Sequence, residues 1–258
     1  MSEILPLIAA LAREAGAMQR AKFNGALTID HKDHATDLVT EVDRAVDGWL
    51  TAALRRHFPA HAVVSEEGDR QASTAEHVWY VDPLDGTTNY AHGYPVFAVS
   101  IALWRGGEPA LGVVYDASRD ELFSAERGAG AFLNGERLRV SRTAALDQAV
   151  VATGFPYDRA THPDNNFAEF ARVTRRAQGV RRGGAAAIDL AYVAAGRLDG
   201  HWERGLNPWD CAAGALLVVE AGGQLSNLQG QPWSLAERWM VATNGLIHNE
   251  LVAVLIGA

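Results

Sequence analysis

The 258-residue sequence predicts a protein of the α/β (α+β) class with two halves that share one compact body. Apolar residues recur at helical spacing over 3–20 and 41–58, so the chain is expected to begin with helices. Residues 97–140 contain β-forming runs separated by turn signals, which predicts a meander of antiparallel strands. Because strands and helices alternate after the meander, we expect an α+β half over 1–145 and an α/β half over 146–258.

The first half is expected to contain two helices, two short buried strands and the meander. Thr40 is a suitable N-cap for the second helix, because its hydroxyl can accept hydrogen bonds from the N–H groups of the first turn. The apolar runs at 62–65 and 78–82 predict buried strands, and each delivers acidic residues at its C-terminal end. Gly106-Gly107 and Ser118-Arg119-Asp120 separate the strands of the meander.

The second half alternates short strands with helices. Strands are predicted for "AVVAT", "GVRR", "DGHWE", "GGQLSN" and "MVATN". Helices are predicted near 166–177, over 184–195 and 208–221, and at the C-terminal end. Pro208 suits the first turn of a helix, where its missing N–H has no intrahelical partner to lose.

The charge balance is acidic, with 23 Lys and Arg against 31 Asp and Glu and a net charge of −8. This charge disfavours direct binding of nucleic acids and of anionic membranes. Cys211 is the single cysteine, so an intrachain disulfide is impossible and a reducing compartment is favoured. No apolar run reaches the roughly 18–20 residues of a membrane-spanning helix. The N-terminal run "ILPLIAALA" lacks a basic leader and indicates a helix instead of a signal peptide. We expect a cytoplasmic protein.

Six carboxylates stand at the ends of predicted elements and not on solvated helix faces: Asp43, Glu66, Glu67, Asp82, Asp85 and Asp210. Each has an ordinary explanation by itself. A carboxylate in the first turn of a helix interacts favourably with the helix dipole, and an Asp-Gly pair is a strong turn signal. Such separate explanations do not account for six carboxylates that all stand at the ends of predicted elements.

The stretch "DPLDGTTNY" at residues 82–90 suggests a common purpose for these groups. Pro83 and Gly86 confine the backbone so that Asp85 can turn back towards Asp82. Two neighbouring carboxylates repel each other unless a cation or a proton lies between them, and oxygen ligands are those that Mg²⁺ prefers. The two threonines that follow offer hydroxyl and N–H groups to a phosphate. The pattern therefore indicates metal-assisted hydrolysis of a phosphate ester.

Four motifs resemble those of the inositol monophosphatase family. "DPLDGTTNY" is similar to the first signature of that family, and "PWDCAAGALLVVEAGG" at 208–223 is similar to the second. "DLVTEVD" at 37–43 and "SEEG" at 65–68 match its supporting motifs in the expected order. The resemblance implies a layered αβαβα sandwich of the type shared with fructose-1,6-bisphosphatases. It also implies a homodimer and sensitivity to lithium.

The resemblance implies a role for each residue that matches a family motif. The ligands of two or three Mg²⁺ ions would be Glu67, Asp82, the backbone carbonyl of Leu84, Asp85 and Asp210. Glu67 and Thr87 would position the attacking water, and Asp43 would accept a hydrogen bond from the Thr87 hydroxyl. Most ligands would then lie in the first half, with Asp210 in the second.

Contacts with a small phosphorylated substrate are implied for Lys32, Gly86, Thr87, Gly184, Ala186, Glu203 and Asp210. The N–H groups of Gly86 and Thr87 would bind the phosphate, and Glu203 would lie along the alcohol. Lys32 matches a basic residue on a mobile loop that helps to close the metal site. Many relatives carry Ser or Thr where this chain has Ala185, which leaves one hydroxyl contact open.

The form "GTTNY" favours myo-inositol monophosphate as the substrate. Fructose-1,6-bisphosphatase, histidinol-phosphatase and 3′-phosphoadenosine 5′-phosphate nucleotidase activities remain alternatives within the superfamily. A different class of function is also open, namely a regulatory factor in RNA metabolism that acts through a protein partner. The intact set of metal-ligand positions argues for an enzyme.

Overall fold

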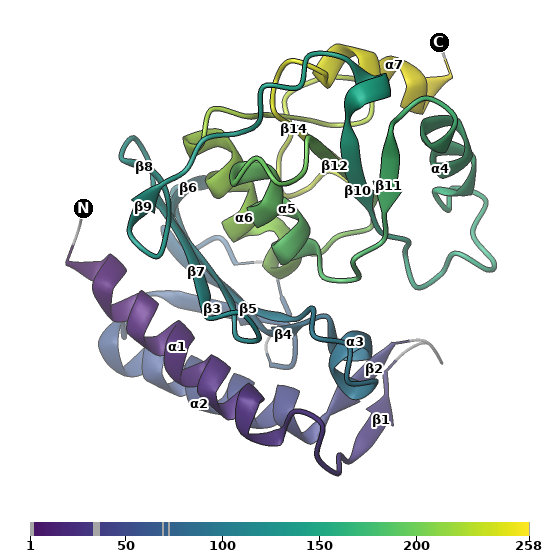
Figure 1. Cartoon of the computed structure of the whole chain (residues 1–258). Coiled ribbons are helices and arrows are strands. Elements are labelled where there is room, and N and C mark those ends of the chain that lie inside the picture. The colour runs from purple at the N-terminus through teal and green to yellow at the C-terminus, as the bar shows by residue number, and fades with distance from the viewer. Residues whose placement is uncertain (1–2, 33–36, 69, 72, 258) are drawn as a thin grey trace.

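The computed structural model describes residues 3–32, 37–68, 70–71 and 73–257. Helices and sheets alternate in layers, so the αβαβα sandwich that the resemblance implied is confirmed (Figure 1). One outer layer holds α1 and α2, the middle layer holds α5 and α6, and the other outer layer holds α4 and α7. The bounds of these helices are α1 Ile4–Lys22, α2 Glu41–His57, α4 Phe167–Thr174, α5 Ala186–Ala194, α6 Pro208–Glu220 and α7 His248–Ile256.

The first sheet has seven strands in the order β3-β4-β5-β6-β7-β8-β9. Its strands are β3 Ala62–Ser65, β4 His77–Asp85, β5 Ala98–Arg105, β6 Glu108–Asp116, β7 Glu121–Glu126, β8 Gly130–Leu133 and β9 Glu136–Arg137. From β4 to β9 all pairs are antiparallel, which confirms the predicted meander. In contrast, β3 pairs parallel to β4, with Ser65 opposite Val81. The C-terminal ends of these two strands therefore lie at the same edge.

The second sheet has five strands in the order β11-β10-β12-β14-β13. Its strands are β10 Val150–Thr153, β11 Gly179–Arg181, β12 Gly200–Arg204, β13 Gln224–Ser226 and β14 Trp239–Thr243. β10 pairs parallel with β11 and β12, whereas β14 pairs antiparallel with β12 and β13. The remaining elements are the β1–β2 pair (Ile29–His31 and Leu38–Thr40), α3 (Thr87–Ala91) and the 3₁₀ turn η1 (Leu146–Gln148).

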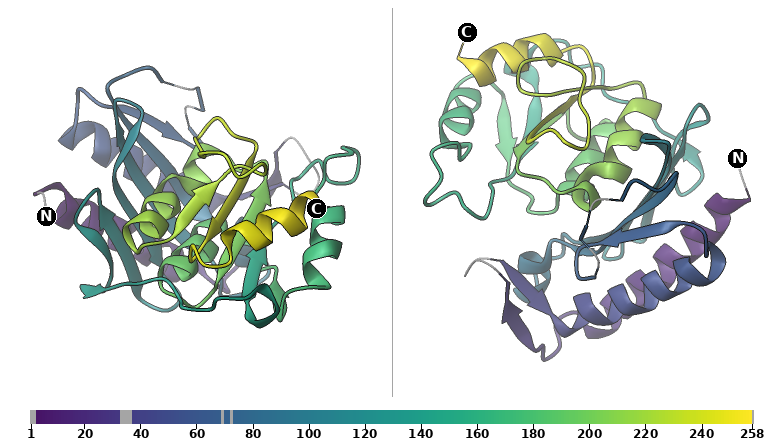
Figure 2. Two further views of the ribbon diagram at one scale, coloured as in Figure 1. Left: turned by 90° about the horizontal axis from the view of Figure 1, so that it is seen from above. Right: turned by 180° about the vertical axis from the view of Figure 1, so that it is seen from behind.

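Local sequence signals explain where the helices begin. The Thr40 side chain accepts hydrogen bonds from the N–H groups of Val42 and Asp43, as expected for the N-cap of α2. The Asp43 carboxylate accepts in return from the Thr40 N–H at 2.8 Å, which completes a capping box. Pro208 occupies the first turn of α6, as predicted. Seen from behind, α1 and α2 lie side by side along the first sheet (Figure 2).

The middle helical layer is made of small side chains packed tightly between the two sheets. Alanine is the most frequent buried residue of both α5 and α6, and α6 contacts strands of both sheets. None of the helices in the described part of the chain is long and apolar enough to traverse a bilayer.

Gly214 marks the closest approach of α5 and α6. A Cβ placed there would lie 2.5 Å from the Cβ of Leu190, a distance at which one helix must move. We expect Gly214→Ala to lower the free energy of unfolding by about 1–3 kcal/mol through overpacking, although Ala is the better helix former. Urea denaturation followed by circular dichroism measures this change.

Gly48 provides a matched control, because it is an exposed helical glycine in α2 with open space around its Cβ position. Gly48→Ala is expected to raise the free energy of unfolding by up to about 1 kcal/mol. Equal changes in the two variants would show that close packing at Gly214 does not limit stability.

Candidate active site

A cavity of about 670 Å³ lies where the C-terminal end of β4 meets the N-terminal ends of α5 and α6 and the end of β12. Nine of the residues to which the family resemblance assigns a role line it: Asp82, Leu84, Asp85, Gly86, Thr87, Gly184, Ala186, Glu203 and Asp210. The cavity therefore gathers groups that are up to 128 positions apart in the chain (82 to 210). Layered packing of the two sheets around the middle helices produces this convergence.

The end of β4 shapes the pair of aspartates. The pairing of β4 with β5 shifts register between Asp82 and Asp85, so the strand bulges at this point. Asp82 accepts a hydrogen bond from the Leu84 N–H at 2.9 Å. Asp85 accepts from the Ala187 N–H at 2.8 Å, in the first turn of α5. Gly86 follows with φ of +89°, and a Cβ there would lie 2.8 Å from the Val96 carbonyl oxygen.

Thr87 lies directly after this turn, and its hydroxyl oxygen is 2.8 Å from Asp43 Oδ1. The same hydroxyl lies 3.0 Å from the carbonyl oxygen of Leu84. A hydroxyl has one proton, so it donates to one of these acceptors at a time. Asp43 is fully buried behind Thr87, outside the residues that line the cavity. The expected hydrogen bond between Thr87 and Asp43 is thus present.

Two neighbouring glutamates occupy different positions. Because β3 runs parallel to β4, Glu66 follows Ser65 at the edge where Asp82 follows Val81, and the Glu66 N–H donates to the Val81 carbonyl at 3.1 Å. Glu66 lines the cavity, whereas Glu67 is not among the lining residues. The structure therefore places Glu66, and not the predicted Glu67, beside the aspartates.

Lys32 links the two glutamates. Its ammonium group is 2.8 Å from Glu66 Oε1 and also forms an ion pair with Glu67. Burial alone would lower the pKa of Lys32, but the attraction of Glu66 and the hydrogen bonds to both glutamates raise it above its usual value. Lys32 is not among the residues that line the cavity, so its contact with the substrate stays a prediction.

The carboxyl groups of the cavity wall carry negative charge that the protein does not fully compensate. Burial raises the pKa of Asp82 and of Asp210 well above the usual range, and the charge of Glu66 raises both further. Burial likewise raises the pKa of Asp85 to about 7. Asp210 accepts a hydrogen bond from the Asn207 N–H at 2.7 Å, within the capping box of α6. Buried acidic groups with this deficit fit a hard cation with oxygen ligands.

In the described ranges, no three Asp, Glu, His or Cys side chains are already grouped as a complete metal cage. Hard cations accept backbone carbonyls, water and phosphate oxygens beside carboxylates, and the Leu84 carbonyl oxygen faces this region. The oxygen donors present therefore suit Mg²⁺ better than they suit zinc, which favours sulfur and imidazole ligands.

The opposite wall is built by the loop before α5 and by β12. Asn89 fixes this loop, since its side-chain amide donates to the carbonyl oxygens of Val96 at 2.8 Å and Gly183 at 2.9 Å. Gly184 adopts φ of +86°, a conformation that L-residues rarely adopt. The acidic side chain of Asp189 and the basic side chain of Arg182 also line this wall. The sequence alone assigned neither residue to the site.

The buried carboxyl group of Glu203 makes stability depend on pH. Burial raises its pKa from 4.5 to about 8, Arg182 opposes the shift and Asp85 adds to it. The folded protein thus binds this proton more tightly than the unfolded chain does. This contribution to stability is fully present below about pH 4.5 and is lost as the pH rises through about 8.

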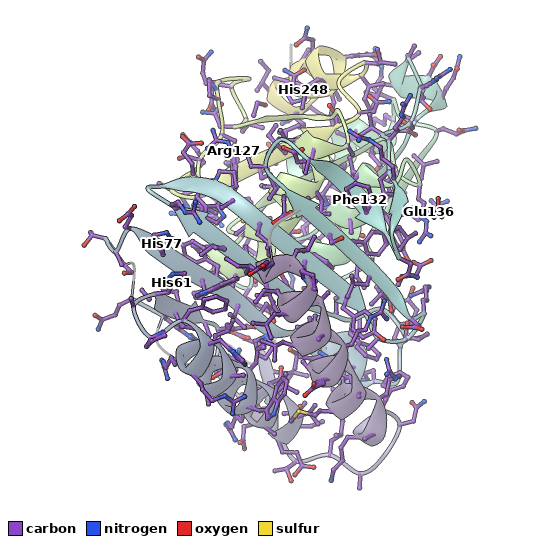
Figure 3. All side chains as sticks on the ribbon, turned by 90° about the vertical axis from the view of Figure 1, so that its left-hand side faces the viewer. His61, His77, Arg127, Phe132, Glu136 and His248 are labelled. Carbon is purple, nitrogen blue, oxygen red and sulfur yellow. The ribbon has the colours of Figure 1, made fainter. Side chains whose placement is uncertain are left out.

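In metal-free buffer, we expect Glu203→Gln to remove this part of the pH dependence and to be more stable than the wild type at about pH 9. Urea denaturation at about pH 5 and about pH 9 measures the effect. Glu136→Gln, at an exposed position on β9 (Figure 3), is the control and should behave like the wild type. A pH dependence that is the same in all three proteins would contradict the assignment.

Comparisons with known proteins agree with the motifs. A model of the inositol monophosphatase family matches residues 1–257. An inositol-1-monophosphatase of Synechocystis is 49% identical over 228 residues, which cover 88% of this chain and 79% of that protein. The Nus factor SuhB of Pseudomonas aeruginosa is 47% identical over 234 residues, 89% of this chain and 86% of that protein. The solved structure of an inositol monophosphatase from Anabaena superposes with a TM-score of 0.89 at 42% identity and covers 99% of this chain and 96% of that one. The chain therefore belongs to the inositol monophosphatase family and is a phosphatase.

Proposed function

We propose that this phosphatase hydrolyses myo-inositol monophosphate and related sugar phosphates in a reaction that depends on Mg²⁺. The observation that carries the proposal is the Thr87–Asp43 hydrogen bond of 2.8 Å beside a cavity walled by Asp82, Asp85 and Asp210. The Thr87 hydroxyl, which can orient water, lies next to acidic groups whose negative charge a bound cation would neutralise. The relative from Synechocystis, named inositol-1-monophosphatase, supports the choice of alcohol.

The ions, two or three in number, would be held by Glu66, Asp82, the Leu84 carbonyl, Asp85 and Asp210. Bound Mg²⁺ supplies a water molecule of lowered pKa and compensates the charge that develops on the phosphate oxygens. Glu66 takes the place in this set that the sequence assigned to Glu67, because Glu66 lines the cavity.

The residues of the chain orient the reacting groups. When the Leu84 carbonyl faces an ion, the Thr87 hydroxyl donates to Asp43, and its own oxygen is then free to accept a hydrogen bond from the attacking water. Two bonds from Thr40 hold the Asp43 carboxylate in place. The N–H groups of Gly86 and Thr87 are the proposed donors to the phosphate, and Gly184, Ala186 and Glu203 face the alcohol.

A second candidate function has one specific support, the relative from Pseudomonas aeruginosa that is named Nus factor SuhB. This chain could accordingly act in RNA metabolism through a protein partner, with catalysis as a separate activity. We retain the homodimer and the cytoplasmic location as parts of the proposal.

Phosphate release from inositol 1-phosphate tests the enzymatic proposal. We expect release that requires Mg²⁺ and is inhibited by Li⁺, and we expect Asp85→Asn to lower kcat at least about 10²-fold by removing a charge from the ion site. Fructose 1,6-bisphosphate, histidinol phosphate and 3′-phosphoadenosine 5′-phosphate belong in the same assay as competing substrates. A higher kcat/KM for any of them would replace inositol 1-phosphate in the proposal.

The two functions are separable in cells. The test is to express Asp85→Asn, which is expected to lack phosphate release, in a deletion strain. If this variant restores the wild-type phenotype in full, the regulatory function is favoured over the enzymatic one as the cellular role.

Glu66 and Glu67 form a matched pair for a second test. Glu66→Gln should lower kcat by about 10²-fold, because a negative group next to Asp82 is lost, and should raise the Mg²⁺ concentration for half-maximal activity. Glu67→Gln should have a smaller effect on both quantities, since its side chain lies outside the cavity lining. A larger loss for Glu67→Gln would restore the assignment made from the sequence.

A further inference from the structure

A fully buried histidine lies behind the cavity wall, between two carboxyl groups. His201 and Glu203 are two positions apart on β12, so their side chains share one face of the strand. His201 Nε2 is 3.5 Å from Glu203 Oε2, and Nδ1 is 3.8 Å from Asp189 Oδ2 on α5. Both distances are at or beyond the limit of a hydrogen bond, and neither ring nitrogen has another partner among the residues that the structure describes. Asp189 and Glu203 line the cavity, whereas His201 does not.

The surroundings of the ring are otherwise apolar. Ala152 on β10 and Ala242 on β14 flank His201 in the sheet, and both belong to the buried core beneath α5 and α6. Burial lowers the pKa of His201 to about 3, so the ring is neutral at physiological pH. Because an unpartnered buried ring nitrogen is unfavourable, the two carboxyl groups are the partners that this position offers.

A neutral imidazole has one donor and one acceptor nitrogen. It can therefore bond both carboxyl groups only if one of them carries a proton. Burial raises the pKa of Asp189 well above its usual range and that of Glu203 to about 8, so one of these two carboxyl groups can carry the proton. The other charged groups that influence Asp189 and Glu203 are Arg182 and Asp85.

We propose that His201 and Asp189 form a positioning row behind Glu203. This row fixes the Glu203 carboxyl group against the alcohol part of the bound phosphate ester, and it thereby determines which alcohols the site accepts. The inference rests on the proposed function of the cavity. Gly154 leaves the space that Glu203 needs, because a Cβ there would overlap the Glu203 carboxyl group. Of the two carboxyl groups, that of Glu203 lies nearer to the ring, at 3.5 Å from Nε2. The ligands that benefit are polyol phosphates, whose hydroxyls bond the fixed carboxyl.

The test compares inositol 1-phosphate, which has ring hydroxyls, with p-nitrophenyl phosphate, which has none. His201→Phe keeps an aromatic ring and removes both ring nitrogens. We expect it to raise KM for inositol 1-phosphate about tenfold more than KM for p-nitrophenyl phosphate, because one hydrogen-bonded contact to the alcohol becomes disordered. His201→Gln, whose amide both donates and accepts, should recover most of the difference.

His248→Phe is the matched control, because His248 is also a buried histidine but is the first residue of α7, outside the cavity lining (Figure 3). It should change the two KM values by equal factors. Asp189→Asn serves as a second variant if His201→Phe does not fold, and it should show the same bias against inositol 1-phosphate.

Equal changes of KM for both substrates in His201→Phe, or no recovery in His201→Gln, would overturn the positioning row. Failure of the wild type to hydrolyse inositol 1-phosphate would instead contradict the proposed function. The same variants would then be compared on the polyol phosphate that the wild type does hydrolyse, with the same expected bias.

Discussion

Repulsion among buried carboxylates is the constraint on which the arrangement of this site depends. Four of these groups accept a hydrogen bond from a backbone N–H. The pairs are Asp82 with Leu84, Asp85 with Ala187, Asp210 with Asn207 and Asp43 with Thr40. Three of the donors stand at or near the start of a helix, where N–H groups lack intrahelical partners and the helix dipole is positive. The fold thus directs the starts of α2, α5 and α6 towards one acidic region.

This compensation is incomplete, and its incompleteness is informative. The pKa values of Asp82, Asp85 and Asp210 remain raised, first by burial and then by neighbouring negative groups, among them Glu66. Lys32 forms its ion pairs with Glu66 and Glu67, and not with these aspartates, in the described part of the chain. A wall that is hydrogen-bonded but still short of positive charge is pre-organised for a cation and for a phosphate bound through it.

Local signals in the sequence predicted much of the fold. Thr40 and Pro208 act within a few residues of themselves, so helix starts could be inferred from short stretches. The approach of Asp85 to Asp82 was also expected, but as a turn after residue 82, whereas β4 continues to Asp85 through a bulge. The family motifs then supplied the layered architecture and nine residues of the cavity wall.

The choice between Glu66 and Glu67 could not be made in that way. It depends on the parallel register of β3 against β4, in which Ser65 pairs with Val81, and register is a property of two strands. The neutral state of His201 likewise depends on burial, to which alanines from two other strands contribute. Pairings across the sheets, absent from any short motif, decide both cases.

The place of α6 between the two sheets has a consequence for folding. Asp210 at its start belongs to the second half of the chain, whereas Asp82 and Asp85 end a strand of the first. An ion or phosphate held by both groups would act as a further cross-link between layers that are otherwise joined by packing and by hydrogen bonds such as that from the Ala187 N–H to Asp85. Ligand binding and the association of the two halves would then be thermodynamically linked. Saturation of the site would stabilise the folded layers against separation from each other and against unfolding of either layer.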